Sequence, residues 1–232
     1  MKKSKQLYIS MSRGEKIRGW LYMAFSLLAL PALLQILNAK LADPLSETEL
    51  NFAYYCVNFL AVCSIFRFFL RDSLVAAWRG LWNFVQAVVL GYAAYWACSR
   101  VMDLAMGYLL PGFQNINDSA ITGMAHANYR LMVIGVVLLV PLTEEVLYRG
   151  LIFRNLYRFS QVAAYLVSMA AFAAIHVLGY LGTESVTTLA VCFLQYLPAG
   201  LCLAWTYTKA DNIFAPIAVH ALVNAIAIGA VR

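Results

Sequence analysis

Long apolar stretches alternate with short polar segments along almost the whole chain. A transmembrane helix needs about 20 predominantly apolar residues, and several stretches come close to that length. They are about Trp20–Leu37, Phe52–Leu70, Leu81–Ser99, a stretch that begins near Leu131, Gln161–Leu178, Val186–Tyr207 and Ile213–Val231. The pattern therefore predicts an all-α, polytopic bundle of about seven transmembrane helices.

The segment between the third and fourth stretches is less regular. Val101–Leu110 is apolar but short, and it ends at Pro111-Gly112. A stretch of this length suits a helix at the membrane interface, a re-entrant segment or even an eighth span. Gln114–Asn128, which includes His126, is expected to form a polar loop.

The composition agrees with a membrane protein. Hydrophobic residues make up 63% of the 232 residues and charged residues 12%, so the chain is far more apolar than soluble domains are. The length suits a single domain over residues 1–232 in contact with the lipid bilayer. The five cysteines fall inside apolar stretches without metal-ligand spacing, so we expect free, buried thiols rather than disulfides.

Basic residues flank the apolar stretches unevenly. They gather before the first stretch, where Lys2, Lys3 and Lys5 lie, and also between the second and third, between the fourth and fifth, and at Lys209. Cytoplasmic loops of membrane proteins carry an excess of Lys and Arg. The N-terminus is therefore expected in the cytoplasm and the C-terminus outside. Because topology explains the net charge of +6, no nucleic-acid partner is expected.

Three ionisable residues stand inside the fourth predicted helix: Glu144, Glu145 and Arg149. Each costs roughly 2.5–3.5 kcal/mol at the centre of a span on insertion scales. Glu145 and Arg149 are four residues apart, so they share a helix face and are expected to pair. Glu144 points about 100° away and has no partner at that spacing. A structural role explains the pair as well as chemistry does, whereas the unpaired Glu144 favours a functional site.

Two histidines join these residues as candidates. His176 lies near the end of the fifth predicted helix, and His220 lies in the seventh, four residues before Asn224 and on the same face. One histidine in a span is usually a structural residue that bonds a neighbour, but two of them with Glu144 and Asn224 favour a site. Depths counted at about 1.5 Å per residue allow all four to share one cavity in the cytoplasmic half of the membrane.

Hydrolysis is the chemistry that these groups support best. A carboxylate in a low-dielectric cavity suits a general base, so Glu144, helped by His176, is expected to deprotonate a water for attack on a peptide carbonyl. His220 and Asn224 are expected to donate hydrogen bonds to the oxyanion that forms. A zinc site is the chemical alternative, since two histidines and a glutamate are ligands of catalytic zinc. The chain has no HExxH pattern to support zinc.

The motifs resemble those of a known family. Glu144-Glu145-x-x-x-Arg149, Phe172-x-x-x-His176 and His220-x-x-x-Asn224 match, in order, the three motifs of the CAAX protease and bacteriocin-processing family, also called the Abi family. The resemblance covers about Leu131–Gly229. It implies a glutamic intramembrane endopeptidase of a bacterial inner membrane that needs no metal or other cofactor. It assigns Glu144, His176, His220 and Asn224 to the chemistry, and Glu145 and Arg149 to support.

The expected partner is therefore a membrane-associated protein or peptide, cleaved near its cytoplasmic end. Two other functions compete with this hypothesis. A bacteriocin-immunity or partner-binding protein could use the same cavity without catalysis. A proton-coupled transporter could also bury Glu and His, but an odd number of spans without inverted repeats argues against it.

Overall fold

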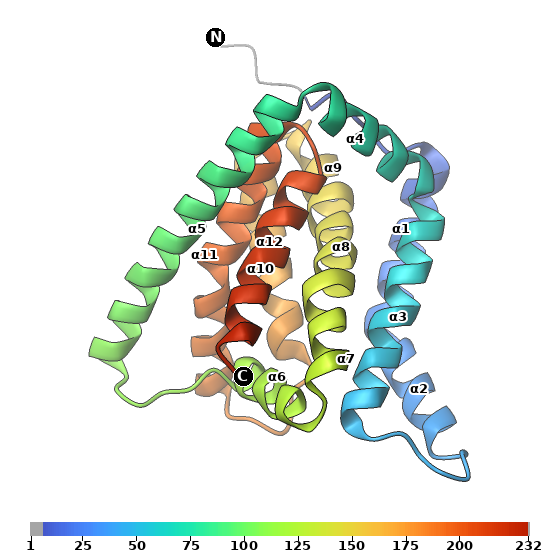
Figure 1. The fold of residues 1–232 in the computed structure, drawn as a ribbon, viewed down its shortest axis with the longest axis vertical. Coiled ribbons are helices and arrows are strands. Elements are labelled where there is room, and N and C mark those ends of the chain that lie inside the picture. The colour runs from blue at the N-terminus through green and yellow to red at the C-terminus, as the bar shows by residue number, and fades with distance from the viewer. Residues whose placement is uncertain (1–6, 232) are drawn as a thin grey trace.

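The computed structural model describes residues 7–231, which are almost entirely helical and contain no strand beyond an isolated bridge (Figure 1). The all-α class is thus confirmed. The elements are α1 (Arg13–Leu28), α2 (Leu30–Asn38), α3 (Glu47–Ile65), α4 (Arg67–Arg79), α5 (Leu81–Leu109), α6 (Ile116–Ala127), α7 (Tyr129–Val133), η1 (Ile134–Leu139), α8 (Val140–Glu145), η2 (Val146–Phe153), α9 (Arg154–Tyr157), α10 (Gln161–Leu178), α11 (Val186–Ala210) and α12 (Phe214–Gly229). The two η segments are π-helical turns within one continuous rod, Tyr129–Tyr157.

In the described part of the chain, three rods are long and apolar enough to cross a membrane: Tyr129–Tyr157, Gln161–Leu178 and Val186–Ala210. The number rises to five if the bent pairs α1–α2 and α3–α4 each count as one span. α12 is a shorter apolar helix. These helices make the chain an integral membrane protein, while the count of seven spans stays a prediction.

The first two predicted spans are bent rather than straight. α1 and α2 meet at 50°, where Pro31 stands in the first turn of α2 and offers no backbone N–H. α3 and α4 meet at 80°, and α4 lies across one end of the bundle in Figure 1. The expectation of a basic loop before Arg79 was therefore wrong. The exposed guanidinium of Arg71, which pairs with Asp72, lets the helix continue outside the apolar core.

The irregular segment also differs from expectation. Val101–Leu110 forms no re-entrant piece, because its residues to Leu109 continue α5. The polar turn there stays helical through an Arg100–Asp103 ion pair of 3.0 Å. The expected loop Gln114–Asn128 instead contains α6, whose first turn is capped by the Asn115 side chain.

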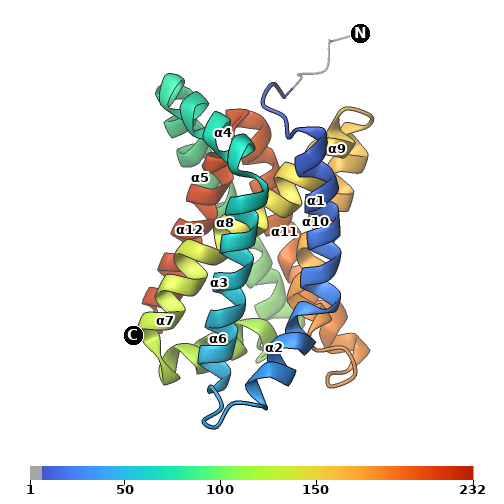
Figure 2. The same ribbon diagram turned by 90° about the vertical axis from the view of Figure 1, so that its right-hand side faces the viewer.

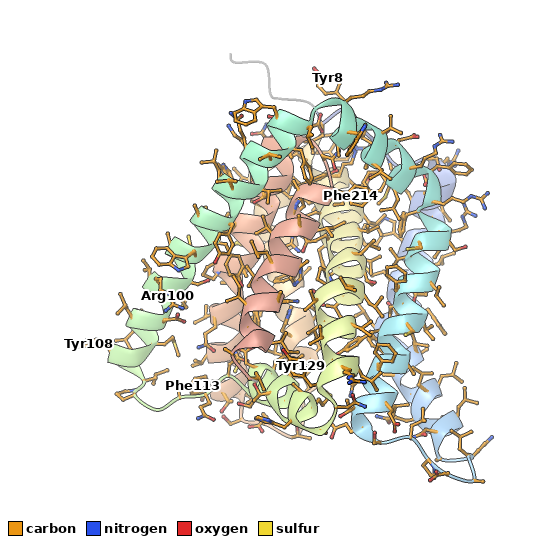
Figure 3. The ribbon with its side chains drawn as sticks, viewed as in Figure 1. Tyr8, Arg100, Tyr108, Phe113, Tyr129 and Phe214 are labelled. Atoms are coloured by element: carbon orange, nitrogen blue, oxygen red, sulfur yellow. The ribbon has the colours of Figure 1, made fainter. Side chains whose placement is uncertain are left out.

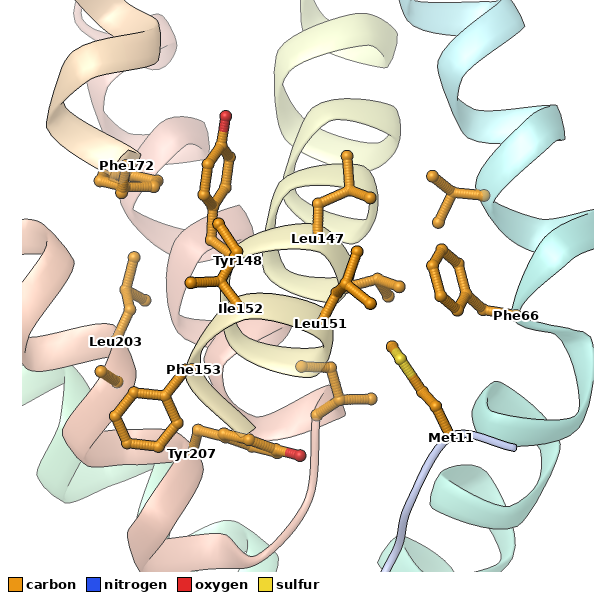
Figure 4. Packing of buried hydrophobic residues seen from close by; sticks show 14 of the residues in the cluster. Met11, Phe66, Leu147, Tyr148, Leu151, Ile152, Phe153, Phe172, Leu203 and Tyr207 are labelled. Carbon is orange, nitrogen blue, oxygen red and sulfur yellow. The ribbon is translucent and has the colours of Figure 1, made fainter. Parts of the chain in front are cut away.

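The core surrounds η2, all of whose residues are buried. Figure 4 shows Leu151 facing Phe66 on one side and Phe153 lying near Tyr207 on the other, where the two rings meet edge to face. The backbones of α10 and α11 approach closely, because a Cβ on Gly200 would lie only 2.8 Å from Met169 Cα. Small residues allow such close approach of helices in a membrane, where packing rather than hydrophobicity drives association.

The two ends of the bundle differ in charge. We call one the basic end; it holds the start of α1, α4 and the α9–α10 connection, while the acidic end holds the α2–α3 loop, α6 and the α10–α11 loop (Figures 1 and 2). In Figure 3, Tyr8 lies at the basic end, and Phe113 and Tyr129 lie at the acidic end. Basic residues at the basic end are Arg13, Lys16, Arg18, Arg67, Arg71, Arg79, Arg154, Arg158 and Lys209. Acids at the acidic end are Asp43, Glu47, Glu49, Asp103, Asp118 and Glu184. Lys2, Lys3 and Lys5 lie outside the described residues.

Candidate active site

A cavity of about 900 Å³ lies between the α1–α3 wall and the rods α7–α9, α10 and α12. Its lining includes Glu144, His176, His220 and Asn224. The structure thus brings together four residues from three rods that are far apart in sequence. Glu145 and Arg149 are not part of the lining and lie behind it, with no exposed surface.

The cavity reaches the acidic end, not the basic one. Glu47, Asp118, Tyr180 and Val231 all line it, and each lies at that end. The core cluster around η2 fills the bundle toward the basic end. The expectation of a cavity near the basic, cytoplasmic half was therefore wrong. Residue counting gives depth along each helix but does not say toward which end the side chains leave space.

The predicted pairing of Glu145 with Arg149 is confirmed, and it belongs to a larger network. Arg149 Nη1 lies 3.0 Å from Glu145 Oε1, and both side chains are fully buried. Arg149 Nη2 donates to the Gly200 carbonyl at 3.1 Å, and the guanidinium lies 4.3 Å from the centre of the Phe172 ring. A buried charge needs such partners because desolvation alone costs several kcal/mol. Arg149 thereby ties the acidic helix turn to α10 and α11.

His220 connects this network to the cavity. Its Nδ1 lies 2.9 Å from the same Glu145 oxygen, so Nδ1 carries the proton and donates it. Its Nε2 lies 4.0 Å from Glu144 Oε2, which is beyond direct hydrogen bonding. For His220 to donate from Nε2 to an oxyanion, both ring nitrogens must carry protons. The carboxylates of Glu144 and Glu145 lie on opposite sides of the ring, next to Nε2 and Nδ1 respectively.

Glu144 is the least satisfied group of the cavity. Its Oε2 is buried and has no hydrogen-bond partner among residues 7–231, while 19% of the side chain is exposed. The ionisable group that lies 4.0 Å from Glu144 is His220, which is on another helix, as the spacing within the helix of Glu144 led us to expect. A buried carboxylate oxygen without a partner costs about 1–3 kcal/mol or more, and a water or a substrate group would relieve that cost.

The His176 side chain is held by one hydrogen bond and by contacts with two aromatic rings. Its Nδ1 donates to the Phe172 carbonyl at 2.8 Å, one helical turn earlier. Its ring lies 4.7 Å from the Phe172 ring and stacks on Tyr196 with centroids 4.0 Å apart. Since Nδ1 carries the proton, Nε2 retains its lone pair and is available as an acceptor.

The side chain of Asn224 forms a hydrogen bond to the backbone of another helix, which the sequence did not reveal. The π-helical turn pairs the Val140 N–H with the Gly135 carbonyl, five residues back. In the same register the Val136 carbonyl would pair with residue 141, but Pro141 has no N–H. Asn224 Nδ2 donates to that carbonyl instead, at 2.7 Å. The second amide proton of Nδ2 is left for the predicted oxyanion contact.

Sequence reasoning missed three residues around this site: Tyr196, Asp118 and Gly200. Tyr196 contacts His176 across two helices, and only the three-dimensional fold reveals that. Asp118 was expected in a loop, although Asn115, three residues earlier, is of a type that commonly caps the N-terminus of a helix. Gly200 lies in α11 and gives its carbonyl to Arg149.

A comparison with protein families agrees with the motifs. Residues 126–226 match the model described as type II CAAX prenyl endopeptidase Rce1-like. Because residues 126–226 are similar to this family, we call them the Rce1-like domain. The matched residues are fewer than half of the chain, and they include all six candidate residues named from the sequence. The resemblance to the CAAX protease family is thereby confirmed over this domain.

One curated relative is similar to part of the chain. It is the UPF0177 protein YxdF of Lactococcus lactis subsp. lactis (strain IL1403), which is 31% identical over 87 residues. The aligned part covers 38% of this chain and 42% of the relative, so the chain spans less than half of that protein. No solved structure matches the chain. Within residues 7–231, no group of three or more His, Cys, Asp or Glu side chains is arranged to hold a metal ion.

Proposed function

We propose that the chain is an intramembrane endopeptidase that hydrolyses a peptide bond in a membrane-associated protein or peptide. The observation that carries this proposal is the unpartnered carboxylate of Glu144 in a cavity that also exposes His176, His220 and Asn224. The Rce1-like match over the same residues supports a peptidase rather than another hydrolase.

Glu144 is the general base in this mechanism. It takes a proton from a water held between its Oε2 and His176 Nε2, and the hydroxide attacks the carbonyl carbon of the substrate. The carbonyl oxygen becomes an oxyanion, which accepts hydrogen bonds from His220 Nε2 and Asn224 Nδ2. Such bonds are strong in a cavity of low dielectric constant. Glu144 then returns its proton to the leaving amine as the C–N bond breaks.

Glu145 and Arg149 support this chemistry without touching the substrate. Glu145 fixes the ring of His220 through Nδ1, and Arg149 fixes Glu145. Because both are fully buried, the orientation of His220 depends on a pair that solvent cannot reach. This arrangement resembles the way in which buried carboxylates orient catalytic histidines in hydrolases.

The acidic end is the side from which a substrate segment enters. If the basic end faces the cytoplasm, as the distribution of Lys and Arg predicts, this entrance faces outward. The cleaved bond then lies nearer to the outer end of the substrate, not to its cytoplasmic end. The cavity lining contains the carboxylates of Glu47, Asp118 and Glu144 but no Lys or Arg among the described residues.

Purified protein in lipid nanodiscs, offered a library of quenched-fluorescent membrane peptides, tests the proposal. We expect Glu144→Gln and His176→Ala each to reduce cleavage by about 10²-fold or more, since general-base catalysis contributes 10²–10⁴-fold. Glu184→Gln, at an exposed residue outside the cavity lining, should cleave like wild type. Unchanged cleavage in both site variants would refute the assignment. Peptide binding or bacteriocin protection that survives Glu144→Gln would instead support the non-catalytic alternative.

A further inference from the structure

Tyr196 is the side chain of α11 in closest contact with a proposed catalytic group. Its ring stacks on the imidazole of His176, with centroids 4.0 Å apart and planes 25° apart. Both side chains line the cavity. None of the three family motifs includes Tyr196, and the mechanism above does not use it.

The hydroxyl of Tyr196 is fixed by α6, which crosses the acidic end. It donates to Asp118 Oδ1 at 2.6 Å and accepts from Asn117 Nδ2 at 3.0 Å. The first turn of α6 is also joined to α11 by a bond of 2.8 Å from Asn115 Nδ2 to Gln195 Oε1. The ring of Tyr196 is therefore anchored at its far end while its face covers His176.

His176 depends on this contact for its orientation. Its hydrogen bond to the Phe172 carbonyl stays within α10 and fixes only Nδ1. The ring of Phe172 is tilted by 54° relative to the imidazole and does not cover its face as Tyr196 does. Without Tyr196, that face would lie open to the cavity and the ring could turn about the Cβ–Cγ bond. A shift of about 1 Å in a group that acts on water can cost about 10²-fold in rate.

We propose that Tyr196 is a positioning residue for His176, and that Asp118 and Asn117 act on the reaction through the Tyr196 hydroxyl. The proposal rests on the proposed function only for its effect on turnover. Its structural part, the confinement of the His176 ring, stands without it. In consequence, α6 sets the geometry of the proposed site although Asn117 and Asp118 lie before the Rce1-like domain.

NMR of protein labelled with ¹³C and ¹⁵N at histidine, in lipid nanodiscs, measures the ring directly. The chain has three histidines, and loss of a signal in His176→Ala assigns His176. A stacked aromatic ring shifts the imidazole protons upfield. We expect Tyr196→Leu to abolish this shift. Tyr196→Phe, which keeps the ring but loses the anchored hydroxyl, should retain part of it with broader signals, and Trp205→Leu, an aromatic loss elsewhere on α11, should leave it unchanged.

Turnover of a peptide that the wild type cleaves gives the second readout. We expect Tyr196→Leu to lower kcat about 10²-fold with little change in KM, and Tyr196→Phe, which keeps the ring but loses the anchored hydroxyl, to have an intermediate kcat. Asp118→Asn retains an oxygen that accepts from the hydroxyl and should recover most of the kcat that Asp118→Leu loses. Asp118→Leu removes that acceptor and should broaden the His176 signals and lower kcat. This variant also tests the link if Tyr196→Leu does not fold.

The two readouts separate the two proposals. Unchanged His176 signals in both Tyr196→Leu and Asp118→Leu would overturn the positioning role. Altered signals with unchanged turnover would keep the positioning role and refute the part of His176 in hydrolysis. Turnover in Tyr196→Phe that differs clearly from turnover in Asp118→Leu would overturn the link through the hydroxyl, because both changes break the same hydrogen bond.

Discussion

At the scale of single residues, the buried guanidinium of Arg149 shows how the chain tolerates charge inside a membrane. It contacts a carboxylate, a backbone carbonyl and an aromatic face, although its Nε finds no partner among residues 7–231. The Glu145 oxygen that receives Arg149 also receives His220. One oxygen of Glu145 therefore contributes both to the stability of the fold and to the proposed oxyanion site. Experiments have to measure these two contributions separately.

Removing Arg149 alone should destabilise the protein and lower its activity. Arg149→Ala leaves Glu145 as an unpaired buried carboxylate, and breaking a buried pair from one side costs about 3–5 kcal/mol. The double change Glu145→Gln with Arg149→Met removes both charges and should recover much of the folded yield. Activity should not return fully, because a glutamine amide holds the ring of His220 less strongly than a carboxylate does.

Thermal stability in detergent, measured for wild type, Glu145→Gln, Arg149→Met and the double variant, completes this cycle. A coupled pair predicts a double variant that is clearly more stable than the sum of the single losses implies. Additive losses would show that the two residues are independent, in conflict with their 3.0 Å contact.

Metal dependence is a second question at this scale. Hydrogen bonds at Nδ1 of His176 and of His220 leave Nε2 of each ring free to bind a metal, as in known zinc sites. Among residues 7–231, however, no group of three or more His, Cys, Asp or Glu side chains is arranged to hold a metal ion. We predict that purified protein carries less than stoichiometric zinc by elemental analysis and that chelation leaves cleavage unchanged. About one equivalent of zinc, with activity lost on chelation and restored by zinc, would establish the metal alternative while keeping the hydrolase assignment.

The residue pairs also show what a sequence can reveal. Glu145 and Arg149 are four residues apart on one helix, so spacing alone predicted their contact. The contact of His220 with Glu145 joins positions 75 residues apart, and no local spacing encodes it. The same is true of Tyr196 on His176. The sequence could therefore name members of the site but not their connections.

At the scale of helices, the contact of α10 with α11 fixes the carbonyl that Arg149 uses. A Cβ on Gly200 would lie 2.8 Å from Met169 Cα and 3.2 Å from its carbonyl oxygen, and backbone cannot move aside as a side chain can. Gly200→Ala should therefore separate the helices, cost about 1–3 kcal/mol and lower activity. Gly107→Ala, in α5 with no atom within 4 Å of the added Cβ, should be neutral or slightly stabilising.

Thermal stability and cleavage of both glycine variants check this prediction. Equal behaviour of Gly200→Ala and Gly107→Ala would mean that α10 and α11 do not pack as closely as the structure has them. Reduced activity at normal stability would still agree with a displaced Gly200 carbonyl.

Helix boundaries were predictable where hydropathy and caps agree. α10 begins and ends where the apolar pattern predicted, at Gln161 and Leu178, and Ser160 caps it. The pattern failed where helices continue through polar residues, as at the Arg100–Asp103 turn of α5, and where a short helix mixes polar and apolar residues, as α6 does. Hydropathy reports contact with lipid, whereas helicity depends on hydrogen bonds and caps that polar residues also supply.

At the scale of the whole molecule, charge is divided between the two ends. Among residues 7–231, the basic end has nine basic residues and three acids, Glu15, Asp72 and Asp211, while the acidic end has six acids against Lys40, Arg100 and Arg130. The cavity reaches only the acidic end. The sequence predicted the charge division, because it depends on position along the chain. It could not predict the direction of the cavity, which depends on how the side chains of separate helices fill the bundle.

The orientation in the membrane follows from this division and can be measured. Excess Lys and Arg favour the cytoplasmic side, so the acidic end and the cavity entrance should face outward. Glu184 in the α10–α11 loop and Arg158 beside α9 are both exposed and lie at opposite ends. In intact cells, a membrane-impermeant maleimide should label Glu184→Cys but not Arg158→Cys, and both should react after the cells are permeabilised. The five native cysteines are buried or half-buried, and labelling of wild type measures their background.

The opposite labelling pattern would place the entrance in the cytoplasm, and the substrate would then be a cytoplasmic segment. Labelling of neither site before permeabilisation would contradict a chain that presents its two ends on opposite sides of the membrane.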